Sequence, residues 1–96
     1  MRIKPSTTPC RLPGREIRSL AEFYDAISLK LSLPPHFGRN LDALWDVLTA
    51  DIKGPVKIIW EESAVSRKAM GPDYDRVSAL LADVQKERND FQVVFR

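Results

Sequence analysis

The sequence predicts an α/β fold in which three short parallel strands form a sheet packed with about four helices. Three observations lead to this prediction. Apolar, β-rich runs lie at 56–60 and 91–95, with a shorter candidate strand at 9–12. Segments with apolar residues at helical spacing separate these runs, two segments in each interval. Strands that are joined through helices favour parallel pairing by right-handed crossovers. The chain contains no internal repeat and no low-complexity segment.

Length and composition indicate one small globular unit. The 96 residues suffice for a single domain with one modest hydrophobic core. We expect residues 1–8, which are polar and lack periodicity, to be a loose N-terminal tail, and residues 9–96 to be the domain. The hydrophobic fraction of 44% excludes a disordered chain, and the apolar runs are too short to cross a bilayer. With one cysteine and no secretory signal, we expect a cytoplasmic protein.

Two helices are predicted in the first half, after a turn at Pro13-Gly14. Ser19 begins the sequence S-L-A-E, a capping box in which the serine hydroxyl accepts from a backbone N–H while Glu22 reaches back. Apolar residues at helical spacing follow, so we predict an amphipathic helix over 19–32, ended by the proline pair after it. Asn40 is a good N-cap for a second helix, which runs over 40–50.

The remaining elements are predicted at 56–60, 62–70, 73–88 and 91–95. The run VKIIW at 56–60 has apolar residues on both faces, which is typical of a central, buried strand. Asp73 is the expected N-cap of the last helix, whose apolar stripe recurs at helical spacing. FQVVF forms the last strand, and we expect Trp60 and Phe95 to point into or beside the core.

Charge is distributed unevenly along the chain. Residues 1–39 carry seven Lys and Arg against three Asp and Glu, whereas residues 40–95 carry seven against ten. The run 40–51 holds Asp42, Asp46 and Asp51 and contains no Lys or Arg. An acidic patch on a protein of net charge +2 points to a basic partner.

The predicted helix over 40–50 presents two stripes. Its core-facing apolar stripe consists of Leu41, Leu44 and Leu48. Asp42, Asp46 and Thr49 form a second stripe, because they are spaced i, i+4 and i+7. Trp45 lies between the stripes, where its ring can anchor at the core margin and still meet a docking partner. An ordinary solvated helix face is the alternative interpretation of the acids.

The residues indicate no enzyme and no cofactor. Two aspartates on one exposed helical turn lack the cleft and the divided environments that carboxylate catalysis needs. His36 has no nucleophile near it in the sequence, so no catalytic triad is apparent. One Cys10 and one His36 cannot build a zinc site, and the isolated glycines form no phosphate-binding loop. We therefore expect no catalytic residues, no metal and no cofactor.

A second interpretation is a small, non-enzymatic RNA-binding or protein-interaction module that uses the basic N-terminal half. Its cations are Arg2, Lys4, Arg11, Arg15 and Arg18. The chain has no recognisable RNA-binding motif, and an acidic surface helix would repel phosphates. We therefore expect neither nucleic acid nor membrane as a specific partner.

The stretch LPPHFGRNLDALWDVLT (33–49) resembles the signature of the barstar family, small intracellular inhibitors of secreted ribonucleases. Weaker similarity covers most of the chain from about Arg11, including VKIIW and FQVVF. The resemblance implies a three-stranded parallel sheet packed with four helices. It also implies a mechanism in which the acidic helix and the loop before it enter the cleft of a basic, barnase-like or related ribonuclease, where carboxylates stand in for RNA phosphates.

The resemblance also implies roles for individual positions. Asp46 corresponds to the central acid that faces the catalytic cluster, and Asp42 to its partner one turn earlier. Two positions depart from the best-studied member, which has a tyrosine where His36 stands and a tryptophan where Asp51 stands. These departures bear on which ribonuclease is bound. The complete set of predicted ribonuclease-binding residues is His36, Gly38, Asn40, Asp42, Trp45, Asp46, Thr49, Asp51 and Asp83.

Overall fold

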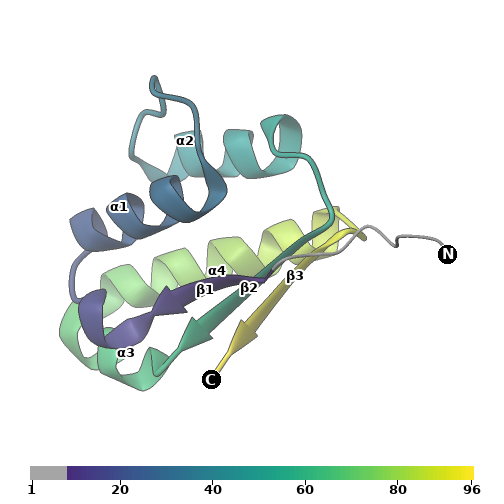
Figure 1. The fold of residues 1–96 in the computed structure, drawn as a ribbon. Helices are drawn as coiled ribbons and strands as arrows, with labels where there is room; N and C mark the ends of the chain where they lie inside the picture. The colour runs from purple at the N-terminus through teal and green to yellow at the C-terminus, as the bar shows by residue number, and fades with distance from the viewer. Residues whose placement is uncertain (1–8) are drawn as a thin grey trace, which may run out of the picture.

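The computed structural model describes residues 9–96, so the tail predicted at 1–8 lies outside the described residues. Strands and helices follow one another in the predicted order (Figure 1). The elements are β1 (Cys10–Pro13), the short 3-10 helix η1 (Gly14–Glu16), α1 (Leu20–Leu31), α2 (Leu41–Asp46), the π-helical turn η2 (Val47–Asp51), β2 (Val56–Glu61), α3 (Ser63–Met70), α4 (Pro72–Glu87) and β3 (Phe91–Phe95). Among residues 9–96, no helix is both long and apolar enough to cross a membrane.

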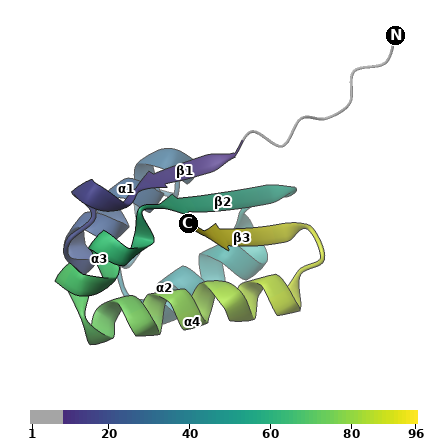
Figure 2. The ribbon, with the colours of Figure 1, turned by 90° about the horizontal axis from the view of Figure 1, so that it is seen from below.

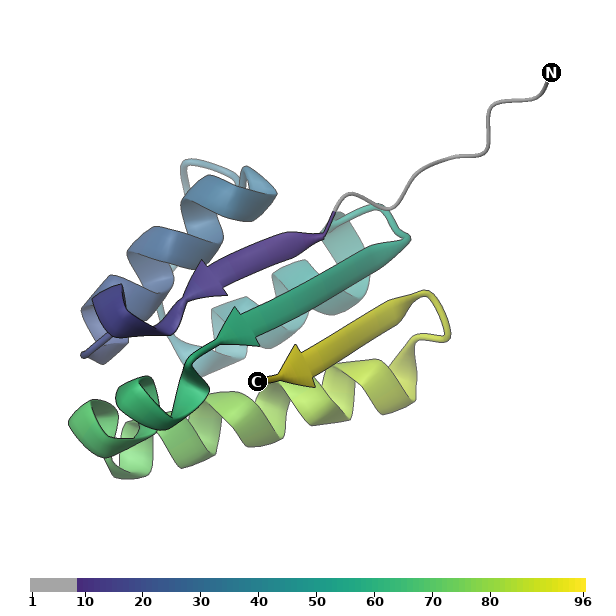
Figure 3. The same ribbon diagram turned by 60° about the horizontal axis from the view of Figure 1, so that its bottom comes forward.

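The three strands form one parallel sheet in the order β1-β2-β3, which confirms the predicted α/β fold and the central position of β2. Helices α1, α2 and α4 lie on one face of this sheet (Figure 2). Helix α3 lies at the end of the sheet where β2 finishes, and no helix from residues 9–96 covers the opposite face (Figure 3). The sheet therefore has one packed face and one open face.

Trp60 is the centre of the packed face, as predicted, with no exposed surface. Its ring stacks on that of Phe23 from α1 at a centroid distance of 5.3 Å. Tyr74 from α4 meets the same indole edge-on at 5.2 Å. Phe95 is 38% exposed and lies 6.2 Å from Trp60, so it borders the core as expected. The indole thus joins β2 to helices from both halves of the chain.

On the open face, Ile59 is only 2% exposed although no helix covers it. The register places Arg11 on one side of it and Val94 on the other. Arg11 reaches along the face to Glu61, whose carboxylate its guanidinium contacts at 2.9 Å. The Arg11–Glu61 pair therefore stands beside Ile59 on this face, where a long arginine stem can cover apolar surface while its head stays in water.

The helix starts are partly as predicted. Ser19 caps α1, accepting a 3.1 Å hydrogen bond from the Glu22 N–H, and the Glu22 carboxylate accepts from the Arg18 N–H at 2.9 Å. The predicted cap at Asp73 is wrong, because α4 begins at Pro72 with Gly71 before it. A proline lacks the N–H that the first helical position leaves unpaired, so it takes that position and the cap lies at Gly71, two residues before the predicted one. Asp73 instead binds Arg76 at 2.7 Å within the first turn.

Candidate protein-interaction site

Asn40 sets the start of the acidic helix. Its Oδ1 accepts a 2.8 Å hydrogen bond from the Ala43 N–H, the geometry of an N-cap, and this confirms the predicted cap. The Asn40 Nδ2 donates to the Gly38 carbonyl at 3.3 Å, which ties the preceding loop to the same cap. The Asn40 side chain therefore fixes the direction in which α2 leaves the loop.

The prediction of one regular helix over 40–50 is wrong in its second half. Helix α2 ends at Asp46, and the chain continues as the wider turn η2, closed by a 3.0 Å bond from the Ile52 N–H to the Val47 carbonyl. The Thr49 hydroxyl donates back to the Trp45 carbonyl at 2.7 Å, a local bond that competes with the regular backbone pattern. Thr49 is half-buried as a result, and does not continue a fully exposed polar stripe.

A hollow of about 160 Å³ separates the loop before α2 from the helix itself. Its walls are formed by Pro34, His36, Phe37, Gly38, Ala43, Asp46, Val47 and Asp51. Four predicted site residues, His36, Gly38, Asp46 and Asp51, therefore come together although up to 15 positions separate them in the chain. Two carboxylates and one imidazole border a concave surface that is open to a partner's side chain.

Asn40 and Asp42 line a second hollow, of about 380 Å³, on the α1 side of the same helix. Its other walls come from Leu20, Tyr24, Arg39 and Leu41. Arg39 binds Asp25 of α1 at 2.9 Å and lies over the Tyr24 ring at 5.7 Å, so its charge is directed toward α1. Burial raises the pKa of Tyr24, and the nearby Asp73 raises it further while Arg39 lowers it.

The acids of this surface form no ion pair with any residue of the described part of the chain. Within residues 9–96, no Lys, Arg or His side chain forms a salt bridge with Asp42, Asp46 or Asp51, and all three residues are exposed. We call these three residues the acid triplet. No cluster of three or more His, Cys, Asp or Glu side chains in the described chain could hold a metal ion. The acid triplet is therefore a carboxylate surface without an internal counter-charge.

The other predicted site residues lie around these hollows without lining them. Trp45 is half-buried and packs against the core, as its place between the two stripes predicted. In the apolar stripe, Leu44 and Leu48 are fully buried and Leu41 is half-buried. Asp83 lies on α4, which packs against α2, with its carboxylate 4.0 Å from Lys86 and 62% of its side chain exposed.

Sequence reasoning missed three residues that shape the site. Phe37 packs edge-on against Tyr24 at 5.7 Å and holds the loop down on α1. Arg39 adopts a positive φ of 54°, which a non-glycine residue rarely shows and which nothing in its neighbours predicts. Arg88, from the turn before β3, reaches the end of η2. For Phe37 the sequence offered one weak signal, an aromatic side chain close to the proline pair at 34–35.

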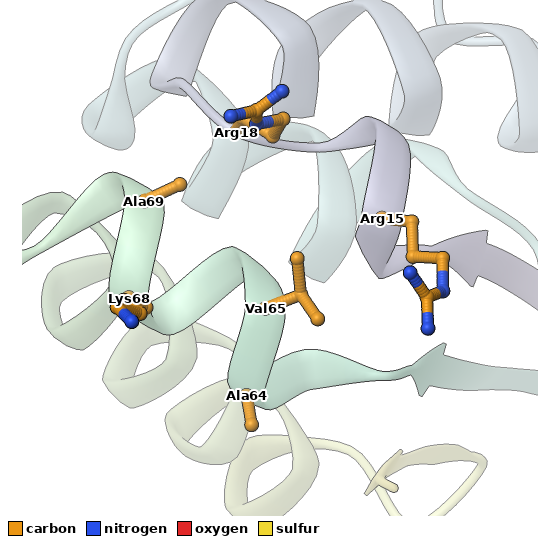
Figure 4. A pocket seen from close by; sticks show the side chains of 6 residues that line it. All are labelled: Arg15, Arg18, Ala64, Val65, Lys68 and Ala69. Carbon is orange, nitrogen blue, oxygen red and sulfur yellow. The ribbon is translucent and has the colours of Figure 1, made fainter.

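The basic N-terminal half is neutralised in part on folding, and its Arg2 and Lys4 lie outside the described residues. Arg11 pairs with Glu61, and Arg15 pairs with Glu62. Arg15 and Arg18 still border a groove of about 560 Å³ with Ala64, Val65, Lys68 and Ala69, where Val65 of α3 projects toward the segment that carries the arginines (Figure 4). The charged residues that line this groove are Arg15, Arg18 and Lys68, and Arg15 is paired with Glu62, so the groove is a small basic patch apart from the acid triplet.

Comparison with known proteins shows a family and a relative to which this chain is similar. The family described as Barstar (barnase inhibitor) matches residues 7–96 of this chain. A protein of Bacillus subtilis (strain 168), named "Putative ribonuclease inhibitor YrdF", is 30% identical over 84 residues, which are 86% of this chain and 92% of that protein. The family match extends over the acidic helix, both hollows and the complete sheet.

Proposed function

The chain belongs to the barstar family, and from this premise we propose that it inhibits a ribonuclease, acting as a binding protein and not as an enzyme. We further propose that it does so by covering the active site of a basic ribonuclease with the acidic helix α2, the turn η2 and the loop before them. The family match and the name of the relative support ribonuclease inhibition in general. The target and the binding surface are inferred from the geometry of the site.

The acid triplet carries this proposal. A ribonuclease cleft holds phosphates with Arg, Lys and protonated His, and it offers the same groups to any well-placed carboxylate. Carboxylates that already had a partner within the chain would have to break that pair before binding. Because Asp42, Asp46 and Asp51 have none within residues 9–96, they can meet those cations directly.

The two hollows suggest how a partner is positioned. Asp46 borders the hollow with His36 and Gly38, whereas Asp42 borders the one on the α1 side. We propose that Asp46 faces the catalytic groups of the ribonuclease and that Asp42 binds a neighbouring cation. Trp45, Asn40 and Thr49 then shape the centre of the interface, and Asp83 its edge.

His36 and Asp51 determine the choice of ribonuclease in this proposal. Both lie on the hollow beside Asp46, so both would meet the partner next to the central acid. An imidazole and a carboxylate recognise different groups than large aromatic side chains do. Specificity rests on such flanking contacts, which can reject one ribonuclease while they accept another.

An inhibition assay tests the proposal, with purified barnase as the probe. Barnase cleaves a fluorogenic RNA substrate while the protein is titrated in at physiological salt. We expect stoichiometric loss of cleavage, no RNA cleavage by the protein alone, and no specific gel shift with short RNA. Undiminished cleavage by barnase and by a panel of other basic secreted ribonucleases would contradict the proposal, and a specific RNA complex would favour the RNA-binding interpretation.

A further inference from the structure

The end of the acidic segment is capped from a distant part of the chain. A helix leaves its last carbonyls without partners, and a cation near that end is favourable. Neither α2 nor η2 has a basic residue in its last turn. The Arg88 Nη1 instead donates to the Leu48 carbonyl at 2.7 Å and to the Ile52 carbonyl at 2.8 Å. One guanidinium therefore donates hydrogen bonds to both carbonyls at the point where η2 ends.

The same guanidinium is held from its other side. The Arg88 Nε and Nη2 donate to the two carboxylate oxygens of Asp90, each at 2.8 Å. The Asp90 carbonyl in turn accepts from the Val56 N–H at 2.8 Å, which anchors this pair at the start of β2. With only 14% of its side chain exposed, Arg88 is held between the sheet and the acidic segment.

Gly54 leaves the room that this arrangement needs. A Cβ at Gly54 would lie 2.0 Å from Asp90 Oδ2 and 2.8 Å from Arg88 Nη2, distances that a real side chain cannot adopt. The loop between η2 and β2 therefore passes directly against the ion pair. We call the set Arg88, Asp90 and Gly54 the η2 clamp.

We propose that Arg88 is a positioning residue of the inhibitory surface: through the η2 clamp it fixes the turn that carries Thr49 and Asp51. The proposal rests on the proposed function, because it assigns these two residues to the interface. Arg88 acts without touching the ribonuclease, since its donors are engaged within the chain. Lysine cannot replace it, because a single ammonium lacks the planar fork that meets two carbonyls and a carboxylate together.

The first test is made on the free protein. Amide hydrogen exchange compares Arg88→Lys with wild type and with the control Arg67→Lys, which makes the same change at an exposed position on α3. We expect exchange within 47–53 to rise about tenfold in Arg88→Lys only, while the buried amides of β2 stay protected. Unchanged exchange in 47–53 would overturn the clamp. Asp90→Asn serves as a second variant, with a smaller rise in the same segment, in case Arg88→Lys does not fold.

The second test measures barnase binding by titration calorimetry. We expect Arg88→Lys to weaken binding about tenfold and Arg67→Lys to leave it unchanged. In a background that carries Thr49→Ala and Asp51→Ala, the effect of Arg88→Lys should largely disappear, because the turn then has no contacts to position. An equal loss in both backgrounds would contradict positioning. Wild-type protein that leaves barnase and the panel of other basic ribonucleases free would contradict the proposed function, whereas the exchange experiment tests the clamp independently of any ribonuclease.

Discussion

The indole Nε1 of Trp60 donates a 2.9 Å hydrogen bond to the Oγ of Ser66, and both side chains are completely buried. The Ser66 hydroxyl in turn donates a 2.8 Å hydrogen bond to the Gly14 carbonyl. A Cβ at Gly14 would lie 2.1 Å from the Glu61 carbonyl oxygen, so the backbone comes this close only at a glycine. A three-membered polar chain thus crosses the core from β2 through α3 to η1.

Replacing Ser66 with alanine should destabilise the fold without changing its shape. The indole N–H would be left buried and unpaired, at a cost of about 1–3 kcal/mol. Urea denaturation followed by tryptophan fluorescence measures this loss. The control is Ser78→Ala, whose hydroxyl donates only to the Asp75 carbonyl within α4. Equal midpoints for the two variants would show that the Trp60–Ser66 bond contributes nothing.

Truncating Asp46 should weaken ribonuclease binding most. We expect Asp46→Ala to cost about 2–5 kcal/mol against the enzyme it inhibits, because a buried cation of the partner would lose its carboxylate. Asp42→Ala should cost less. Asp75→Ala is the matched control, since Asp75 is an exposed acid of α4 outside the proposed interface. If Asp46→Ala inhibits as well as wild type while it remains folded, the acid triplet is only a solvated helix face.

The fold itself should not depend on the acids of α2. Asp42 and Asp46 stand one turn apart, where like charges repel by a few tenths of a kcal/mol. We therefore expect Asp46→Ala to unfold in urea at the same midpoint as wild type or slightly above it. A clearly lower midpoint would indicate that the carboxylate supports the structure, and the binding loss would then need reinterpretation.

Asp51 should affect the rate of association more than the strength of the final complex. The protein carries a net charge of +2, so a basic ribonuclease is repelled at long range and attracted only near the acid triplet. Asp51→Ala removes part of that local attraction, which acts within a Debye length of about 8–10 Å. Stopped-flow association at several salt concentrations tests this. A change confined to the dissociation rate would instead place Asp51 in the interface centre.

Cys10 should resist alkylation in the folded protein. It is 7% exposed in β1, and burial raises the pKa of its thiol to about 11, with Lys30 opposing the rise. At pH 8 only about one thiol in a thousand is then the reactive thiolate. We expect iodoacetamide to label the protein rapidly in urea and hardly at all without it. Rapid labelling of the native protein would mean that β1 opens readily.

Protonation of Asp90 should release the η2 clamp. The hydrogen bond from Arg88, together with its charge, holds the pKa of Asp90 below the ordinary value of 3.8. A carboxyl with a lowered folded-state pKa stabilises the fold above its unfolded pKa, and this contribution is lost as the pH falls through the folded value. Asp90→Asn should therefore be less stable than wild type at pH 7, and the difference should shrink as the pH falls below the ordinary value of 3.8, as measured by urea denaturation. A difference that persists in acid would exclude the carboxylate charge as its source.

The sequence predicted those features that depend on neighbouring residues. Asn40 and Ser19 act as caps through bonds to residues three positions away, so their roles follow from local sequence. VKIIW was predicted as the central strand because its apolar residues lie on both faces of the strand. The cap was wrongly predicted at Asp73 because two helix-start signals lie side by side there. An aspartate is a good N-cap, and a proline is favoured at the first helical position. In the structure Pro72 occupies the first helical position, so Asp73 falls inside the helix.

The missed features depend on contacts between distant segments. The widening at η2 involves the Thr49 hydroxyl and an arginine from beyond α4, so a helical periodicity over 40–50 could not reveal it. Arg39 turns toward α1 because Asp25 and Tyr24 lie there, which only the packed structure brings about. The acidic positions of the site could thus be predicted from the sequence, whereas their surroundings could not.

Arg88 follows Leu48 by 40 positions in the chain and Ile52 by 36, and this separation has a consequence for folding. Bringing such distant residues together requires closure of a long loop, whose entropy must be lost before the contact stabilises anything. The Asn40 cap forms within three residues, so α2 can start early, whereas η2 stays unfinished until the corner between α4 and β3 has docked. A nascent chain on the ribosome would therefore carry the complete acid triplet well before it could hold Asp51 in place.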